Sequence, residues 1–128
     1  MTSWNQKVRV AVGNVSLELP NAVPKRQDAP IDSAASVFEG GGVTVIVDQS
    51  PFADRLDSLA GLPEYREEVK NVGGTIGRMV FFHSPDRSMY TVGIHLPAPA
   101  HVTIVVQADA SVPERIPREI VGSLRLLN

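Results

Sequence analysis

Two of the three histidines in the chain, His95 and His101, lie on either side of a Pro-Ala-Pro loop. If that loop joins two antiparallel strands, the register that matches apolar faces places these side chains opposite each other, with Cβ atoms about 5 Å apart. Two imidazoles at that distance could share a metal ion, but a catalytic zinc site takes a third protein ligand. The expected neighbours on that face, Gly93, Thr91 and Thr103, include no acid. We therefore predict no metal site, and His95 and His101 are the candidates should one exist.

The third histidine, His83, is predicted to lie on the same face, opposite Met89 at the far end of its hairpin. About 20 Å of strand separates it from His95, so the three imidazoles cannot meet in one zinc site. A general base must lie within hydrogen-bonding reach of its partner, and no acid is expected beside His95. The histidines thus give no indication of catalysis.

Two glycine-rich stretches, EGGGV at 39–43 and VGGTIGRM at 72–79, lack the Lys-Ser/Thr of a phosphate-binding P-loop. The first is typical of a hairpin turn, and the second predicts a helix end followed by a close-packing position in a strand. Ser50, Ser84 and Ser111 all precede proline, and the chain has no Gly-x-Ser-x-Gly motif. We predict no catalytic residue, no cofactor-binding residue and no cofactor.

The elements that must position these residues begin with the stretch VRVAVGNVSLEL at 8–19. Its Gly13-Asn14 pair suits a two-residue hairpin turn. Folding there predicts the pairs Val12–Val15, Val10–Leu17, Val8–Leu19 and Arg9–Glu18. A second hairpin is predicted around the glycines at 40–42, and its strand at 43–47 is apolar on both faces. Such a strand is typical of the inside of a sheet that is covered on both sides.

The period of the apolar residues changes after residue 50. Ser50 suits a helix N-cap and Gly61 a helix end, so the spacing predicts a helix over 51–61. A second helix is predicted over 63–70. A third is predicted to begin near Ile116, with a short strand over 123–127 after it.

Residues 73–109 predict three consecutive strands, with turns centred on 85–86 and 97–99. Matching apolar faces fixes the expected register. It pairs Phe82 with Tyr90, Val80 with Val92, Ile94 with Val102, and Val92 with Ile104.

This order of elements predicts a single α+β domain spanning residues 1–128. The expected architecture is an α/β/α sandwich, with a mainly antiparallel sheet and helices on both faces. The predicted core residues are Val10, Leu17, Val45, Val80, Val92, Ile104 and Ile120.

Composition excludes several functions. The 128 residues carry a formal net charge of −2 and no cysteine, which excludes disulfides, thiolate metal sites and a cysteine nucleophile. Lys and Arg do not cluster in the sequence, so the charge pattern gives no indication of nucleic-acid binding. No stretch approaches the roughly 18 apolar residues of a membrane span. The start MTSWNQKVRV has no apolar leader region, so we expect a cytoplasmic protein, or a periplasmic or secreted one if a leader was removed.

The layout resembles the PsbP-like superfamily, which includes the photosystem II extrinsic protein, a Ran-binding nuclear-import factor and DcrB-type bacterial lipoproteins. The resemblance rests on the segments VSLELP, VTVIV, LDSL, TIGRMVFF, MYTVGIHL and HVTIVVQA and the closing IVGSLRLL. It implies an α/β/α sandwich and a non-catalytic accessory or adaptor role. No functional residue of the family maps onto this chain, which also lacks a lipoprotein cysteine.

We therefore expect a non-catalytic protein-binding accessory, adaptor or chaperone module of a bacterial protein. Its predicted binding surface is the sheet edge formed by Val8, Val10 and Val12, since unpaired strand edges accept further strands. The expected partner is another protein, with a second copy of the chain as one option. Two alternatives stay open: an immunity protein that neutralises a cognate toxin, and a small-ligand or metal-binding protein that uses the sheet face around His95 and His101.

Overall fold

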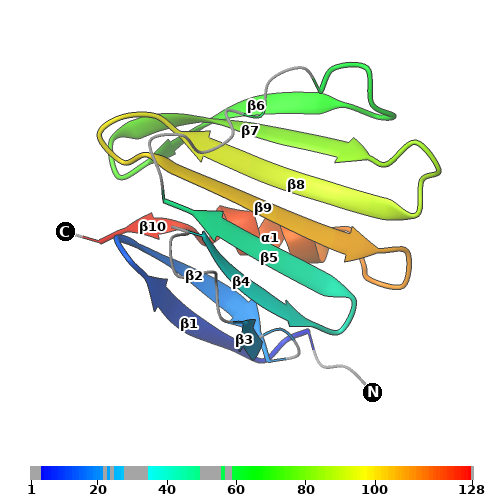
Figure 1. Cartoon of the computed structure of the whole chain (residues 1–128), viewed down its shortest axis with the longest axis horizontal. Coiled ribbons are helices and arrows are strands. Elements are labelled where there is room, and N and C mark those ends of the chain that lie inside the picture. The colour runs from blue at the N-terminus through cyan, green and yellow to red at the C-terminus, as the bar shows by residue number, and fades with distance from the viewer. Residues whose placement is uncertain are drawn as a thin grey trace.

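The computed structural model of the chain describes residues 4–21, 23, 25–27, 35–49, 56 and 59–127. These residues form two antiparallel sheets and one helix (Figure 1). Sheet A has the strand order β1 (Lys7–Val12), β2 (Val15–Pro20), β10 (Arg125–Leu126). Sheet B has the order β3 (Lys25–Gln27), β4 (Ala35–Gly40), β5 (Val43–Asp48), β9 (Val102–Asp109), β8 (Met89–Leu96), β7 (Thr75–His83), β6 (Arg66–Val72).

The predicted α/β/α sandwich with helices on both faces is wrong. The described residues hold ten strands and a single helix, α1 (Arg115–Gly122), so the fold is mainly antiparallel β. The helix predicted over 63–70 is instead strand β6. The segment is a strand because Gly73 and Gly74, predicted to end a helix, instead form a two-residue hairpin turn with φ of 57° and 93°. Most of the helix predicted over 51–61 lies outside the described residues.

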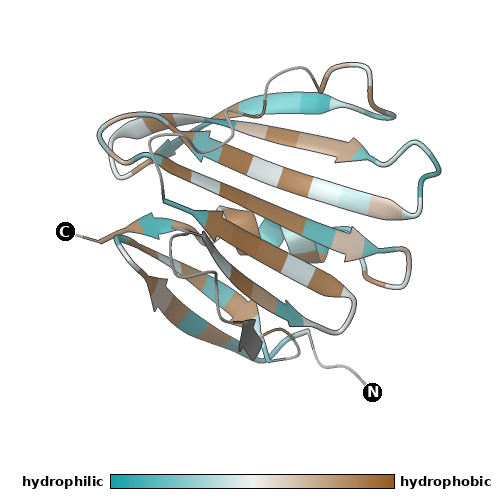
Figure 2. Ribbon diagram, viewed as in Figure 1, coloured by the Kyte–Doolittle hydropathy of each residue, from teal (hydrophilic) through white to brown (hydrophobic). Residues whose placement is uncertain are grey.

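The core lies between one face of sheet B and a layer made of sheet A and α1. Helix α1 contacts β8, β9 and β2, and Figure 1 shows it crossing behind β9. The buried cluster draws side chains from all three parts, such as Leu17 of β2, Ile104 of β9 and Ile120 of α1. Figure 2 shows β5, β8 and β9 as the most hydrophobic part of sheet B. Apolar burial on this face stabilises the fold, because side chains of both sheets and the helix pack in one core.

Most of the predicted core is confirmed. Six of the seven residues are buried, and Val10 is half-buried against the cluster. Val80 is buried on the other face of sheet B, where its side chain and that of Leu56 both lie over Gly93. The buried predicted residues are Leu17, Val45, Val80, Val92, Ile104 and Ile120.

The first hairpin forms in the predicted register, from the Val12–Val15 pair to the Val8–Leu19 pair. The second hairpin turns at the predicted glycines, and β5 lies inside sheet B between β4 and β9. Helix α1 begins one residue before the predicted start, and Pro117 lies in its first turn, where a backbone donor has no intrahelical partner. The predictions for these segments are confirmed. They succeeded because turn residues and periodicity there indicate the same structure.

The register predicted between β7 and β8 is wrong by one residue. Val92 lies opposite Phe81, not Val80, and Tyr90 lies opposite His83. A shift of one residue moves every side chain of β7 to the other face of the sheet. His83 therefore lies on the core face of sheet B, whereas His95 lies on the opposite face.

The turn between β7 and β8 explains this register. The carboxylate of Asp86 accepts hydrogen bonds from the hydroxyls of Ser84 and Ser88 at 2.7 Å, and from the backbone N–H of Ser88 at 3.0 Å. The Ser88 hydroxyl, the Ser88 N–H and the Ser84 hydroxyl lower the pKa of Asp86 to about 2. The turn closes where the Ser84 N–H donates to the Met89 carbonyl, which sets the pairing of the strands beyond it.

Candidate functional site

The predicted pairing of His95 with His101 does not form. Five residues, Pro97 to His101, connect β8 to β9, so the strands pair Leu96 with Val102 and His95 with Thr103. The His95 Nδ1 lies 2.8 Å from the Thr103 hydroxyl oxygen. His101 lies in the connecting loop with φ of 50°. The register prediction was wrong because it assumed a shorter loop.

Val8, Val10 and Val12, the predicted protein-binding residues, lie on β1, the outer strand of sheet A. Their side chains share the face that leads into the core. Exposure falls along the strand: Val8 is 43% exposed, Val10 is half-buried and Val12 is buried. The three valines therefore anchor an edge strand whose other side pairs with no described residue.

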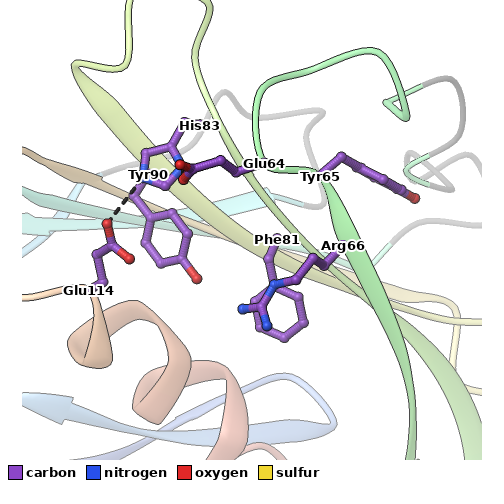
Figure 3. Close-up of a pocket in the computed structure, with 7 residues that line it drawn as sticks. All are labelled: Glu64, Tyr65, Arg66, Phe81, His83, Tyr90 and Glu114. Atoms are coloured by element: carbon purple, nitrogen blue, oxygen red, sulfur yellow. Dashed lines mark hydrogen bonds and ion pairs between the residues drawn. The ribbon is translucent and has the colours of Figure 1, made fainter.

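A polar cluster that the sequence did not predict surrounds His83 at the end of β7 (Figure 3). The His83 Nε2 lies 3.1 Å from an oxygen of Glu114, the N-cap residue of α1. Its buried Nδ1 lies 2.8 Å from an oxygen of Glu64, an ion-pair distance without the alignment of a hydrogen bond. The imidazole also contacts the Tyr90 ring at 4.8 Å between centroids. His83 thus joins the segment before β6, the end of β7 and the start of α1.

The chemistry of this cluster follows from the two carboxylates. A neutral imidazole has one N–H and can donate to one partner, whereas an imidazolium can donate to two. Glu64 also receives an ion pair from Arg87 at 3.2 Å. Since both ring nitrogens of His83 already face carboxylates, the cluster suits electrostatic cross-linking better than proton transfer to a bound molecule.

The cluster lines one side of a cavity of about 340 Å³, whose full lining is Glu64, Tyr65, Arg66, Phe81, His83, Tyr90 and Glu114. The Arg66 guanidinium lies over the Phe81 ring, 5.0 Å from its centroid. Burial raises the pKa of Tyr90, and the nearby cations Arg118 and Arg66 partly oppose this. Figure 3 shows the Tyr90 hydroxyl and the Arg66 guanidinium on the same side of the cavity. A phenol donor beside a guanidinium suits a small anion at this end of the cavity, whereas the carboxylates of Glu64 and Glu114 at the other end would repel one.

No single sequence motif contains the members of this cluster. Glu64, His83 and Glu114 come from three distant segments, and they meet only because β7 presents His83 to the core face. The register predicted from apolar matching placed His83 on the wrong face. Recognition of the Ser84–Asp86–Ser88 turn would have corrected it.

Two further findings concern metal ligands and membrane spans. Among the residues that the structure describes, no group of three or more His, Asp and Glu side chains is arranged to hold a metal ion. The described part of the chain also has no helix with the length and hydropathy of a membrane span.

No model of a known protein family matches this chain, and comparison with curated proteins also gives no match.

Proposed function

We propose that this chain is a non-catalytic protein-binding module, acting as an accessory, adaptor or chaperone, and that it receives a strand of its partner on the outer edge of β1. The observation that carries the proposal is the position of β1 at the border of sheet A, with β2 on one side. An unpaired edge offers backbone donors and acceptors to an incoming strand.

The backbone geometry of the hairpin supports this use of β1. A two-residue turn at Gly13-Asn14 leaves its flanking residues, Val12 and Val15, as a hydrogen-bonded pair, and such pairs alternate along the strands. The Asn21 N–H, which donates to the Gln6 carbonyl at 2.8 Å, continues the same alternation. The backbone groups of Val8, Val10 and Val12 therefore face β2. Those of Lys7, Arg9 and Ala11 face outward, where a partner strand would bind.

Replacing Ala11 with proline tests the proposal, because it removes one outward N–H and leaves the bonds to β2 in place. We expect Ala11→Pro to weaken partner binding by about tenfold or more, since it loses a hydrogen bond and adds a steric block. Ala11→Val keeps the N–H and is the matched control. Binding is measured by affinity capture from the native organism, followed by titration with the purified partner.

Partner binding by the two variants and amide exchange together test whether β1 is the binding surface. Support requires that Ala11→Val retains the partner that Ala11→Pro loses, and that amide exchange at Arg9 and Ala11 slows when the partner binds. If both variants bind equally, or the protected amides lie elsewhere, the β1 edge is not the binding surface.

The origin and family of the chain are also part of this proposal. A bacterial origin and a relationship to the PsbP-like superfamily are proposals that rest on the order of the sequence segments. The implied accessory role agrees with strand binding on β1. An immunity protein that binds a cognate toxin is one form of the same function, since it needs a protein-binding edge and no catalytic group.

The cavity beside Arg66 favours a second candidate function, the binding of a small carboxylate or phosphate. Arg66 lies over the Phe81 ring and beside the Tyr90 hydroxyl, and it forms no ion pair with a described carboxylate, although Glu64 and Glu114 line the same cavity. Titration with acetate and with inorganic phosphate should shift the NMR signals of Phe81 and Tyr90. Arg66→Gln should abolish the shifts, and the remote Arg125→Gln should not. Equal shifts in both variants would contradict a site at this cavity.

A further inference from the structure

We infer that β6 pairs antiparallel with β6 of a second copy of this chain, about a twofold axis at Val69, and so joins the two seven-stranded sheets. This surface lies on a different sheet from β1. The inference therefore goes beyond the proposed function and stands independently of it.

The starting observation is an exposed apolar side chain on an edge strand. Strand β6 is the outer strand of sheet B and pairs with β7. Val69, at its middle, is 75% exposed, and Ile76 on β7 is 54% exposed. Pairing places both on the same face as diagonal neighbours, beside a hollow of about 380 Å³. Figure 2 shows the rest of β6 as mostly hydrophilic, so Val69 departs from its surroundings.

The turn at Gly73-Gly74 determines which backbone groups of β6 face away from β7. In this two-residue turn Val72 and Thr75 form a hydrogen-bonded pair, and the alternation along the ladder follows from it. Residues 66, 68, 70 and 72 therefore direct their backbone groups to β7. On β7 the His83 N–H, which donates to the Pro63 carbonyl at 2.9 Å, faces the β6 side as Phe81 and Met79 do. Glu67, Val69 and Asn71 direct their N–H and C=O groups outward.

Among the symmetric registers centred on residues 68, 69 and 70, at the middle of β6, charge selects one. If the axis passed through Glu68, that residue would face its own copy and Arg66 would face Lys70, so like charges would oppose each other. If it passed through Lys70, two lysines would meet. With the axis at Val69, Glu68 faces Lys70 of the second copy and Lys70 faces Glu68 of the second copy.

The same register also pairs the outward backbone groups of β6 and covers the exposed side chain of Val69. Val69 faces Val69 of the second copy, and Glu67 faces Asn71 of the second copy. The backbone groups of these residues pair with no described strand, so each such pair can exchange two hydrogen bonds. Glu68 and Lys70 then form the pairs without backbone bonds, in which side chains are closer. The interface is isologous, as closed homodimers require.

Charge reversal provides the experiment. Sedimentation velocity over a range of concentrations should show wild-type chain moving from the 13.8 kDa monomer to a particle of twice that mass. Glu68→Lys and Lys70→Glu should each weaken self-association by about tenfold or more, since each places like charges opposite each other twice. An equal mixture of the two variants should associate again, because every facing pair then has opposite charges. The double variant Glu68→Lys/Lys70→Glu should self-associate like the wild type.

The controls separate this surface from others. Ala11→Pro on β1 should leave self-association unchanged. Slower amide exchange at Val69 and Asn71 with rising concentration, in wild-type protein, gives a readout that needs no variant. The inference is overturned if the wild type stays monomeric at its highest soluble concentration, or if the mixed variants fail to associate. It is equally overturned if Ala11→Pro removes self-association.

Discussion

Replacing Ile104 with alanine should lower the free energy of unfolding by about 2–5 kcal/mol. Ile104 is fully buried at the middle of β9, where it lies between Val47 of β5 and Ile94 of β8. Truncation removes buried apolar surface and leaves a cavity that paired strands on both sides cannot close. Urea denaturation followed by circular dichroism measures the loss, with an unchanged slope as evidence that the native fold persists.

The matched control is Ile76→Ala, the same chemical change at a side chain that is 54% exposed. We expect it to change the free energy of unfolding by about 0.5 kcal/mol or less. Equal losses for the two variants would show that Ile104 does not lie in the core.

Replacing Gly77 with alanine should cost about 1–3 kcal/mol of stability, although the change adds a single methyl group. A Cβ at this position would lie 2.5 Å from Leu96 Cδ2 and 3.0 Å from the His95 carbonyl oxygen. Leu96 is fully buried, so its side chain has little room to move, and the carbonyl belongs to the sheet backbone. The sequence had predicted a close-packing position in this stretch, and the structure confirms it at Gly77.

Gly122→Ala is the control for this prediction, because a Cβ at that position, the end of α1, would meet nothing within 4 Å. It should leave stability unchanged or raise it slightly, since alanine favours helix. A double variant with Leu96→Ala tests the cause: the added methyl should cost less once Leu96 is shortened. Additive losses would assign the strain to the backbone contact with His95 instead.

The sequence predicted those parts of the fold in which local signals agree. Around Gly13-Asn14 the turn residues and the alternating valines indicate the same hairpin, and the observed register matches. Over 63–70 the spacing of Leu62, Tyr65 and Val69 suits a helix, but the Gly-Gly turn that follows makes the segment a strand. Spacing alone could not decide, because tertiary pairing with β7 overrides a weak local preference.

The register of β7 could not be predicted from hydropathy, because the strand is apolar on both faces. Met79 and Phe81 are buried on one face, and Val80 is buried on the other. Two registers one residue apart therefore bury similar surface, and the hydrogen bonds of Asp86 decide between them. The position of His83 depends on that choice. This explains why its contacts with Glu64 and Glu114 were missed although the strands themselves were predicted.

The pairing of β10 with β2 has a consequence for folding during synthesis. Ser16 of β2 pairs with Arg125 of β10, so sheet A joins residues from the start of the described chain to residues near its end. On the ribosome, β2 leaves the exit tunnel long before β10 and α1, and until they follow it has β1 as its strand partner in sheet A. A two-stranded hairpin is marginally stable in water. Sheet A therefore becomes stable late in translation, and until then β2 has an unpaired edge that a chaperone could bind.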